Sequence, residues 1–466
     1  MKLSLLAEYE GVKLGDIRRE KRLMEMVEAL ARKPDASMPE VFSDGAELEG
    51  SYRFLRNEHV GYEAILAQHR DNTATRARAC GAVLAVHDTT EFNFGKNPRQ
   101  DLGRVGQGKS HGFYGHPTLV VAQDNHLPLG VGAFEPYRRD GKQAKNGGKS
   151  GHSKRHKDPT NEGLRWFRGV EATAKALEGC PSIIHLMDRE ADDFALLADM
   201  LEHQHRFVIR SSYDRRTLDE NLKLSELLES TPLLEGTREI NLSRRGASSF
   251  PSNRKRHPPR KKRQARLSIR ATKVVVRRPN SAPTRCPKTI DLSLVQVLEP
   301  SPPEGEKPVV WNLWTTEPCD TATQVWAIVD AYRARWIIEE YFKVLKTGCS
   351  YESRQFETEA SLLRLLAVFI PIAWWLLLLR TLERIAPNRP ATAMLSPLHL
   401  RCLRLALKKI KVELPDSPSI RELLRGLARL GGHIKYNGAP GWLVVLRGLG
   451  KLFVLVDGFY LAQEEM

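Results

Sequence analysis

The sequence predicts an α/β protein with an RNase H-like core, and three features of its 466 residues support this fold class. Up to about residue 75, apolar side chains recur at helical spacing. From there to about residue 210, short apolar runs bounded by polar turns are followed by alternating helical and apolar segments. From about residue 362 the pattern is again helical and rich in leucine. Three strands followed by alternating helix and strand are the element order of an RNase H-like core, here with helical regions at both ends.

The N-terminal region is expected to be helical because Leu23, Met26 and Leu30 fall on one helix face, and Ile65 and Leu66 mark a later helix. Three short apolar runs then predict strands at residues 83–86, 118–122 and 129–134. Asp124-Asn125 lies between the second and the third of these runs, so we expect a hairpin turn there.

The rest of the core is expected to alternate between helix and strand. Helical patterns cover residues 162–177 and 193–202, and apolar runs follow them at 183–187 and 207–209. The region from about 215 to 320 is β-rich, with candidate strands at 267–269, 274–276, 292–297 and 309–314. We therefore predict a helical N-terminal domain at 1–75, an α/β core at 76–365 that carries this β-rich insertion, and a helical C-terminal domain at 366–466.

The charge balance favours a polyanionic partner. The chain has 72 Lys and Arg against 56 Asp and Glu, so its formal net charge is +16. Cationic side chains that neutralise phosphates gain affinity by releasing condensed counterions. Nucleic acid is therefore the first expected partner and an anionic membrane surface the second. The same balance disfavours a glycosidase built on paired acids.

The chain is expected to be cytoplasmic. Its six cysteines are scattered without a C-x2-C pair, which indicates neither a zinc site nor a disulfide framework. The first ten residues include Glu8 and Glu10 and do not resemble a signal peptide. One membrane-like stretch, residues 365–379, contains Pro371 and is shorter than the roughly 20 residues that a span needs, so we predict a buried helix.

Two aspartates directly follow apolar runs: Asp88 follows residues 83–87 and Asp188 follows residues 183–187. Neighbouring strand ends would bring these carboxylates together, and adjacent carboxylates repel unless a cation lies between them. Oxygen ligands with room for water suit Mg²⁺ or Mn²⁺. With Glu339 added from a helix, the set predicts a cage for two ions about 3.5–4 Å apart, which clamp the attacking and leaving oxygens of a phosphoryl displacement.

A second pattern consists of Tyr332, Arg335, Glu339 and Lys346. At about 100° per residue in one helix, these four side chains would share a narrow face. A phenol, two cations and a carboxylate on one face predict a surface for phosphate and metal.

Ordinary structural roles are the alternatives for these residues. An Asp after a strand is commonly a turn or cap residue. Glu339 could instead form surface ion pairs with Lys343 and Lys346. His87 and His185, which flank the aspartates, are expected to face the core.

The spacing of Tyr332, Arg335, Glu339 and Lys346 resembles the YREK signature of the insertion-sequence-four family of bacterial DDE transposases. Residues 188–192, with the sequence DREAD, resemble the block around the second aspartate of that family. The chain is most similar to the transposon-five type, and the likeness covers nearly its whole length. The further matching segments are Asp88-Thr89-Thr90 at the first aspartate, Leu14-Gly15-Asp16 with Arg18-Arg19 and residues 52–57 in the DNA-binding domain, and residues 427–432 and 440–442 in the dimerisation region.

The resemblance implies that Asp88, Asp188 and Glu339 hold two Mg²⁺ ions, or Mn²⁺, in each active site. It implies that Tyr332, Arg335 and Lys346 contact phosphates and the displaced 5′ end of the non-transferred strand. Guanidinium and ammonium groups suit this role because they donate charge-assisted hydrogen bonds to phosphate oxygens. Two neighbours within these motifs, Arg189 and Lys343, are expected to contact DNA as well.

In this family a tryptophan from the β-rich insertion stacks on a base flipped out of the transposon end. By its distance from Glu317-Pro318, Trp311 matches that position better than Trp314. Such stacking contributes roughly 1–3 kcal/mol. Core packing in a strand is the alternative for either ring.

Two basic stretches, residues 138–157 and 254–266, have no counterpart in the family that can be aligned. Each either binds the DNA backbone or forms a solvated loop.

The sequence thus predicts a homodimeric, magnesium-dependent cut-and-paste transposase, associated with the nucleoid in a bacterial cytoplasm. It would bind the terminal inverted repeats of a transposon in double-stranded DNA, cleave the ends through a hairpin and join the 3′ ends to target DNA, with neither a membrane nor a small-molecule substrate. Two alternatives remain: a catalytically inactive end-binding protein or inhibitor of transposition, and a structure-specific nuclease without strand transfer.

Overall fold

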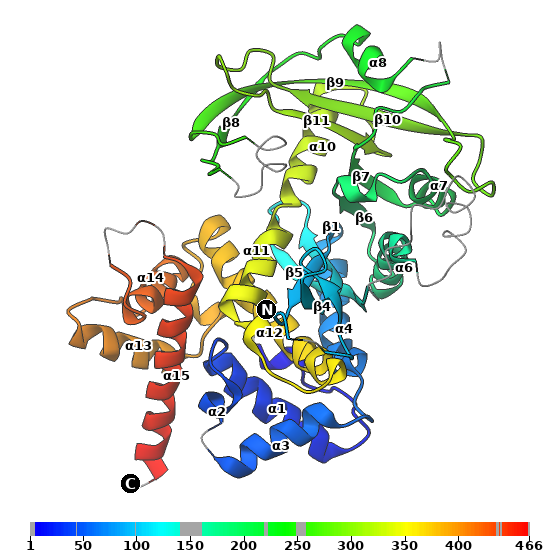
Figure 1. Cartoon of the computed structure of the whole chain (residues 1–466). Helices are drawn as coiled ribbons and strands as arrows, with labels where there is room; N and C mark the ends of the chain where they lie inside the picture. The colour runs from blue at the N-terminus through cyan, green and yellow to red at the C-terminus, as the bar shows by residue number, and fades with distance from the viewer. Residues whose placement is uncertain are drawn as a thin grey trace. The chain divides into compact units, whose positions relative to one another are not determined.

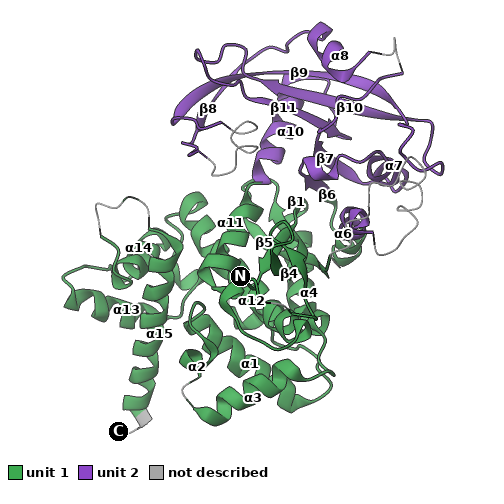
Figure 2. Cartoon of the chain, in the orientation of Figure 1, with its two compact units in different colours: residues 1–143, 171–182, 336–466 green, residues 144–170, 183–335 purple. Residues whose placement is uncertain are grey.

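The computed structural model describes residues 5–42, 44–97, 99–139, 161–218, 222–247, 258–434, 438 and 440–464 (Figure 1). The chain divides into two compact units (Figure 2). Unit 1 contains Met1–Gln143, Glu171–Ser182 and Trp336–Met466, and unit 2 contains Ala144–Val170 and Ile183–Arg335. The chain therefore passes from one unit to the other four times.

The N-terminal part of unit 1 is helical, as predicted. Its elements are η1 (Leu6–Glu8), α1 (Ile17–Arg32), α2 (Met38–Val41), α3 (Gly45–Arg56) and α4 (Tyr62–Cys80). Asp16 caps α1 by accepting a hydrogen bond from the Arg18 amide at 2.9 Å, and Gly15 before it has a φ of 75°, which favours glycine. The predicted domain boundary at residue 75 lies inside α4.

The sheet of unit 1 is built around one long strand. This strand, β4 (Ser110–Ala122), pairs antiparallel with β1 (Ala82–His87), β2 (Thr90–Asn93), β3 (Gly103–Val105) and β5 (Pro128–Tyr137). Every residue of β4 is buried. The predicted hairpin is confirmed, because Asp124 and Asn125 lie in the turn between β4 and β5.

Helix α12 (Glu359–Ile385) is the core helix of unit 1. It is long and apolar enough to cross a membrane by length and composition alone, yet 94% of its most apolar 18-residue window is buried inside the structure. The predicted buried helix at residues 365–379 is therefore confirmed, with Pro371 inside it. The predicted boundary at residue 365 lies within α12, so helix packing continues across it.

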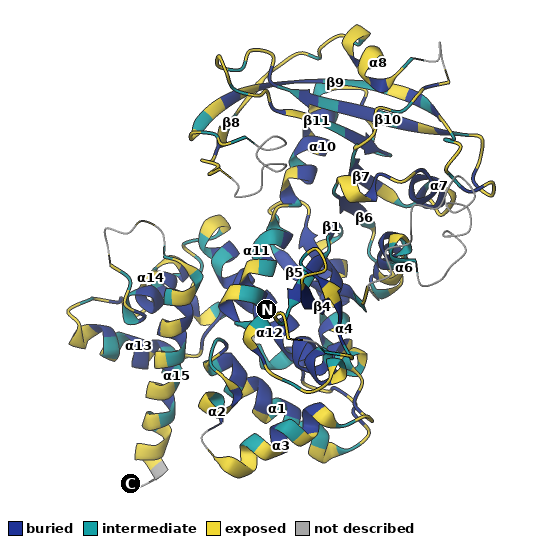
Figure 3. Ribbon diagram, viewed as in Figure 1, coloured by how far each residue is buried: buried dark blue, intermediate teal, exposed yellow. Residues whose placement is uncertain are grey.

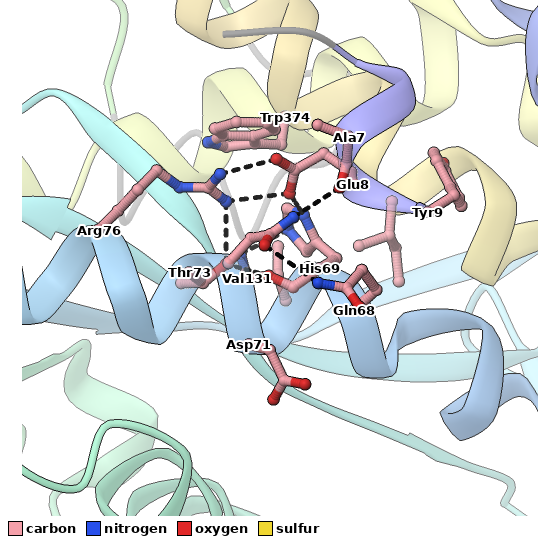
Figure 4. Close-up of polar contacts among 12 residues, drawn as sticks. Ala7, Glu8, Tyr9, Gln68, His69, Asp71, Thr73, Arg76, Val131 and Trp374 are labelled. Carbon is pink, nitrogen blue, oxygen red and sulfur yellow. Dashed lines mark hydrogen bonds and ion pairs between the residues drawn. The ribbon is translucent and has the colours of Figure 1, made fainter. Parts of the chain in front are cut away.

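A buried polar network fastens η1 to the rest of unit 1 (Figure 4). The Glu8 carboxylate accepts hydrogen bonds from the Arg76 guanidinium at 2.7 and 3.0 Å and pairs with Nδ1 of His69. The other ring nitrogen of His69 accepts from the Val131 amide of β5 at 3.0 Å. The guanidinium of Arg76 also lies 4.3 Å from the ring centroid of Trp374 in α12. One network thus joins η1, α4, β5 and α12.

The remaining elements of unit 1 are α11 (Ile337–Lys343), the π-helical segment η4 (Val344–Gly348), η5 (Tyr351–Ser353), η6 (Ala391–Ala393), α13 (Pro397–Lys409), α14 (Ile420–Leu430) and α15 (Trp442–Glu464). Glycines lie at the contact between α14 and α15. A Cβ on Gly448 would lie 1.7 Å from the Leu427 carbonyl oxygen, and one on Gly431 would lie 1.8 Å from that of Val444. Only glycine allows this approach.

Unit 2 contains a mixed sheet, so the predicted α/β class is confirmed. Strands β6 (Ser182–Met187) and β7 (Arg206–Arg210) are parallel. Beyond β7, the order of strands in the sheet is β11 (Val310–Thr315), β10 (Thr289–Leu298), β9 (Arg263–Arg277) and β8 (Arg238–Leu242), each antiparallel to its neighbour. The helices of unit 2 are η2 (Glu162–Leu164), η3 (Arg189–Ala191), α7 (Phe194–Glu202), α8 (Leu224–Ser230) and α10 (Ala322–Ala334). Helix α6 (Arg165–Ala176) begins in unit 2, and its residues from Glu171 on belong to unit 1.

One prediction in the β-rich insertion is wrong. The apolar runs at 267–269 and 274–276 belong to the single strand β9. The polar residues between them stay in the strand because their backbone continues the ladder with β10. The Arg270 guanidinium, which interrupts the apolar pattern, donates hydrogen bonds from one of its terminal nitrogens to main-chain carbonyls, including that of Thr231 at 3.0 Å.

Candidate functional site

In unit 1, the first candidate aspartate lies directly after β1. Asp88 is half-buried, and one of its carboxylate oxygens accepts a hydrogen bond from the Thr89 amide at 2.7 Å. The Thr89 hydroxyl in turn lies 2.9 Å from Nδ1 of His116. His87 is fully buried and contacts the Thr118 hydroxyl at 3.0 Å, so its predicted orientation toward the core is confirmed. His185 is likewise buried.

Glu339 and Lys346 also belong to unit 1. Glu339 is a half-buried residue of α11, and Lys346 lies in the π-helical segment η4. The Lys346 ammonium is 3.6 Å from a Glu352 carboxylate oxygen and 5.7 Å from the centroid of the Phe92 ring. Glu352 also accepts from the Asn93 amide at 2.8 Å. The side chain of Lys346 is therefore held beside β2, the strand that follows Asp88.

In unit 2, the acidic residues of the DREAD segment have different surroundings. Asp192 is 2% exposed and accepts hydrogen bonds from the amides of Ser212 at 2.6 Å and Tyr213 at 3.0 Å. It also forms an ion pair with Arg215 at 2.6 Å. Glu190 pairs with Arg165 at 3.0 Å. Asp188 is half-buried and caps η3 by accepting from the Glu190 amide at 2.8 Å.

The parallel pairing of β6 and β7 places Arg210 at the strand end that Asp188 follows. Met187 at the end of β6 is opposite Ile209 of β7, so Asp188 and Arg210 leave the sheet at the same edge. Burial lowers the pKa of Arg210, and the nearby Arg189 lowers it further. The sequence analysis missed Arg210, because its position beside Asp188 depends on a parallel pairing that a single sequence does not show.

Tyr332 lies within this cluster. Burial raises the pKa of its phenol, Arg335 and Arg210 act against that rise, and Asp188 adds to it. The phenol therefore stays protonated near neutral pH and can donate a hydrogen bond. Unit 2 thus gathers Asp188, Arg210 and Arg335 around the Tyr332 phenol, an arrangement suited to phosphate oxygens.

The two tryptophans of β11 lie on opposite faces of the strand, because their positions differ by an odd number. Trp314 is fully buried in the core formed with α7 and α8. Core packing is therefore the correct interpretation for Trp314. Trp311 is half-buried, and its ring centroid is 6.2 Å from that of Tyr332. Of the two rings, Trp311 is the one beside the Tyr332 cluster.

The prediction of one uninterrupted α-helix through Tyr332, Arg335, Glu339 and Lys346 is wrong. Helix α10 ends at Ala334, Arg335 and Trp336 form a turn, α11 begins at Ile337 and a π-helical segment starts at Val344. Arg335 and Trp336 keep right-handed helical backbone angles, whereas the π-helical segment departs from 100° per residue before Lys346 is reached. The first two residues belong to unit 2 and the last two to unit 1.

The predicted metal ligands are likewise shared between the units, with Asp88 and Glu339 in unit 1 and Asp188 in unit 2. Their carboxylate oxygens fit the donor set that Mg²⁺ and Mn²⁺ prefer. Among the residues that the structure describes, no group of three or more His, Cys, Asp and Glu side chains forms a metal site. Convergence of the three carboxylates therefore stays a prediction.

The other predicted DNA contacts lie at the surface. Arg189 and Lys343 are exposed, and so are Arg18 and Arg53 of the N-terminal region, with side chains 88% and 72% exposed. Most of the first basic stretch, residues 140–157, and residues 254–257 of the second lie outside the described residues.

Two family models match the chain. Residues 4–60 match the transposase DNA-binding family, and residues 168–370 match the transposase DDE domain. These matches support a DDE transposase with a DNA-binding N-terminal region as the class of this protein. A piggyBac transposase synaptic complex with hairpin DNA is a structural neighbour with a TM-score of 0.34 and 10% sequence identity, over 97% of this chain and 73% of the other. No conclusion depends on so distant a likeness.

Proposed function

We propose that the chain is a cut-and-paste DNA transposase of the insertion-sequence-four family, of the transposon-five type, with an RNase H-like core. The main support is that the region matched by the DDE domain contains Asp188, Tyr332, Arg335, Glu339 and Lys346 at the spacing of the DREAD and YREK motifs. Asp88 lies outside that match, and its position at the end of β1 supports its role.

In this proposal Asp88, Asp188 and Glu339 hold two Mg²⁺ ions, or Mn²⁺. When bound, such ions activate a water or hydroxyl as nucleophile and stabilise the charge that develops on the scissile phosphate. The protein side chains position the DNA. Arg335, Arg210 and Arg189 bind phosphate oxygens beside Asp188, and the protonated Tyr332 phenol donates a hydrogen bond to one of them.

The proposed substrates are the terminal inverted repeats of a transposon and a target duplex. Cleavage frees a 3′-hydroxyl, this hydroxyl attacks the opposite strand to form a hairpin, and the reopened end is joined to target DNA. Trp311 supports the hairpin by stacking on an unpaired base, since its half-buried ring lies beside Tyr332. Lys346, held by Glu352, binds the displaced strand. The proposed location is the bacterial cytoplasm, at the nucleoid.

The proposed assembly is a homodimer formed through α15. The second half of this helix is largely exposed (Figure 3), and its exposed residues include the apolar Val454 at 55% and Leu461 at 64%. A groove beside it is lined by Leu405 and Ile410 of the α13 region together with Leu455. Contiguous exposed apolar surface of this kind marks an interaction site.

Three single substitutions test the proposed chemistry. Asp88→Ala, Asp188→Ala and Glu339→Ala should each abolish nicking of transposon-end DNA, because each removes a metal ligand, and should leave end binding in gel shifts intact. The matched control is Glu340→Ala on the same helix, since Glu340 pairs with Arg384 at 2.9 Å and has no proposed role in cleavage. Nicking by any of the three variants at the unaltered rate would remove that residue from the proposed active site.

An inactive end-binding protein is the second candidate. It would usually lack one of the carboxylates, and here all three are present. A nuclease without strand transfer is the third. An assay with a pre-cut transposon end separates it from a transposase, because only a transposase joins that end to a second duplex.

A further inference from the structure

A two-stranded ribbon ends the sheet of unit 2. Strand β8 is the last strand in the sheet order and pairs with β9 from Arg238 opposite Leu267 to Leu242 opposite Arg263 (Figure 1). A further bridge between Arg245 and Arg260 keeps the same register, with two backbone hydrogen bonds of 2.8 and 2.9 Å. We call residues 238–245 and 260–267 the β8–β9 ribbon.

The two faces of this ribbon differ in polarity. Cross-strand partners lie on the same face, and side chains alternate along each strand. One face carries Ile240, Leu242, Ala265 and Leu267, which are buried or half-buried. The opposite face, which we call the ribbon face, is polar throughout. It carries Glu239, Asn241, Ser243 and Arg245 from one strand and Arg260, Lys262, Gln264 and Arg266 from the other.

The cations on the two faces are neutralised to different extents. On the apolar face, Arg238 pairs with Asp330, and Arg263 pairs with Glu299 and lies 3.9 Å from Glu306, whereas Arg244 and Lys261 form no ion pair with a described residue. The ribbon face has a single acid, Glu239, and it lies 3.4 Å from Arg266. Neither Arg245 nor Lys262 forms an ion pair with any residue that the structure describes. The ribbon face thus has one acid for its four cations, whereas three acids pair with the cations of the apolar face, so the larger excess of positive charge lies on the ribbon face.

This excess of positive charge destabilises the ribbon in the free protein. Arg245 and Arg260 are direct cross-strand partners, and like charges in that position destabilise a strand pair. Burial lowers the pKa of Arg260, and Arg245 lowers it further. Charged side chains on an edge strand also prevent edge-to-edge association, but that role is served by charges of either sign. An excess of positive charge therefore indicates a negatively charged ligand.

We propose that the ribbon face binds the phosphate backbone of duplex DNA. Alternate residues of a strand are about 6.4–6.8 Å apart, so Arg260 and Lys262 are neighbours along the ribbon face, and Arg266 follows them beyond Gln264. The Arg260 guanidinium also donates to the Ser243 carbonyl at 3.1 and 3.3 Å. A two-stranded ribbon also fits the major groove of B-DNA, which is about 12 Å wide. Contacts with phosphates carry no sequence information, so this face binds any duplex. The inference rests on the proposed DNA partner and is independent of the proposed chemistry.

The test compares two double variants of the full chain. Arg245→Ala with Lys262→Ala removes two cations from the ribbon face, and Arg244→Ala with Lys261→Ala removes two exposed cations of the same ribbon whose register places them on the other face. Binding to a random-sequence duplex is measured by fluorescence anisotropy across a salt series, in a metal chelator so that no cleavage occurs. The ribbon-face variant should bind on the order of tenfold more weakly, with a salt slope smaller by about 2. The other variant should bind as the unaltered chain does.

Each outcome decides between the proposals. Equal loss in both double variants would overturn the assignment to the ribbon face, because charge alone would then explain binding. Unchanged affinity and salt slope in the ribbon-face variant would overturn the inference and leave the proposed function standing. Absence of duplex binding by the unaltered chain would overturn both. Arg245→Lys with Lys262→Arg should retain the salt slope, and equal unfolding temperatures would show that all the variants are folded.

Discussion

At the scale of single residues, Asp188 and Asp192 show how one short motif combines two roles. Asp192 is buried, and its carboxylate is fully engaged by the Ser212 and Tyr213 amides and by Arg215. It fixes the segment that follows β7 to the segment that follows β6. Asp188 is half-buried and lies near Tyr332. The same residue type therefore serves the fold at one position and the proposed chemistry at the other.

Substitution should separate these roles. Asp192→Ala should lower the free energy of unfolding by about 3–5 kcal/mol, because it leaves the buried Arg215 charge without its partner. Asp188→Ala should change it by less than about 1 kcal/mol, since a short cap contributes little. Urea unfolding followed by circular dichroism measures both values. Similar losses in the two variants would contradict the division of roles.

At the scale of elements, the attachment of η1 depends on protonation. Burial by itself would raise the pKa of the Glu8 carboxyl, but the hydrogen bonds with His69 and Arg76 hold it below its ordinary value. Burial lowers the pKa of His69 despite the neighbouring carboxylate. In both cases the unfolded chain binds a proton more readily than the folded chain, so folding weakens as the pH falls.

The free energy of unfolding should therefore decrease as the pH falls below about 6.5, where unfolded His69 takes up a proton, and again below about 4.3, where unfolded Glu8 does. Each group should contribute on the order of 1.4 kcal/mol per pH unit until its folded pKa is reached. His69→Gln should remove the loss between pH 6.5 and 5. Denaturant titrations at several pH values test this, and an identical pH profile in His69→Gln would contradict it.

The packing of α14 against α15 gives a second prediction at this scale. Gly448→Ala should destabilise unit 1 by about 1–3 kcal/mol or more, because its Cβ would overlap a main-chain oxygen. Gly458→Ala on the same helix is the matched control: no atom lies within 4 Å of its added Cβ, and alanine is the better helix former by about 1 kcal/mol. The unfolding temperature should therefore fall in Gly448→Ala and rise in Gly458→Ala. A shift of the same sign in both variants would contradict the packing argument.

Most elements could be predicted from the sequence because their apolar spacing is regular, as in β1, β6 and α12. The break between α10 and α11 could not. Arg335 and Trp336 contain neither glycine nor proline, and the helical spacing continues across them. The placement of Asp88 and Asp188 at strand ends was predicted correctly. The proximity of Arg210 depends on strand pairing, which no local pattern encodes.

At the scale of the whole molecule, the proposed homodimer predicts a separation between folding and assembly. Val454→Glu places a charge on the exposed apolar side of α15, at a position that is already 55% exposed, so the monomer should fold normally. Assembly on transposon-end DNA should be lost, because a carboxylate would have to be buried at the interface. Light scattering of the DNA complex measures the number of copies.

The control for this prediction is Gln463→Glu, which adds the same charge at an exposed polar position of the same helix. It should leave assembly unchanged. A complex of two copies formed by Val454→Glu as readily as by the control would exclude this side of α15 as the dimer contact.

Because the chain passes four times between the units, the two units become complete at different times during synthesis. Arg335 is the last residue of unit 2, whereas unit 1 draws on residues up to the final helix. Because compact units fold as they emerge from the ribosome, unit 2 can fold while unit 1 still lacks α12 and everything after it. Until α12 has been synthesised, Trp374 is absent, and Arg76 of the Glu8 network lacks the ring against which it packs. A translating chain is thus expected to need protection at its N-terminal helices until α12 has been made.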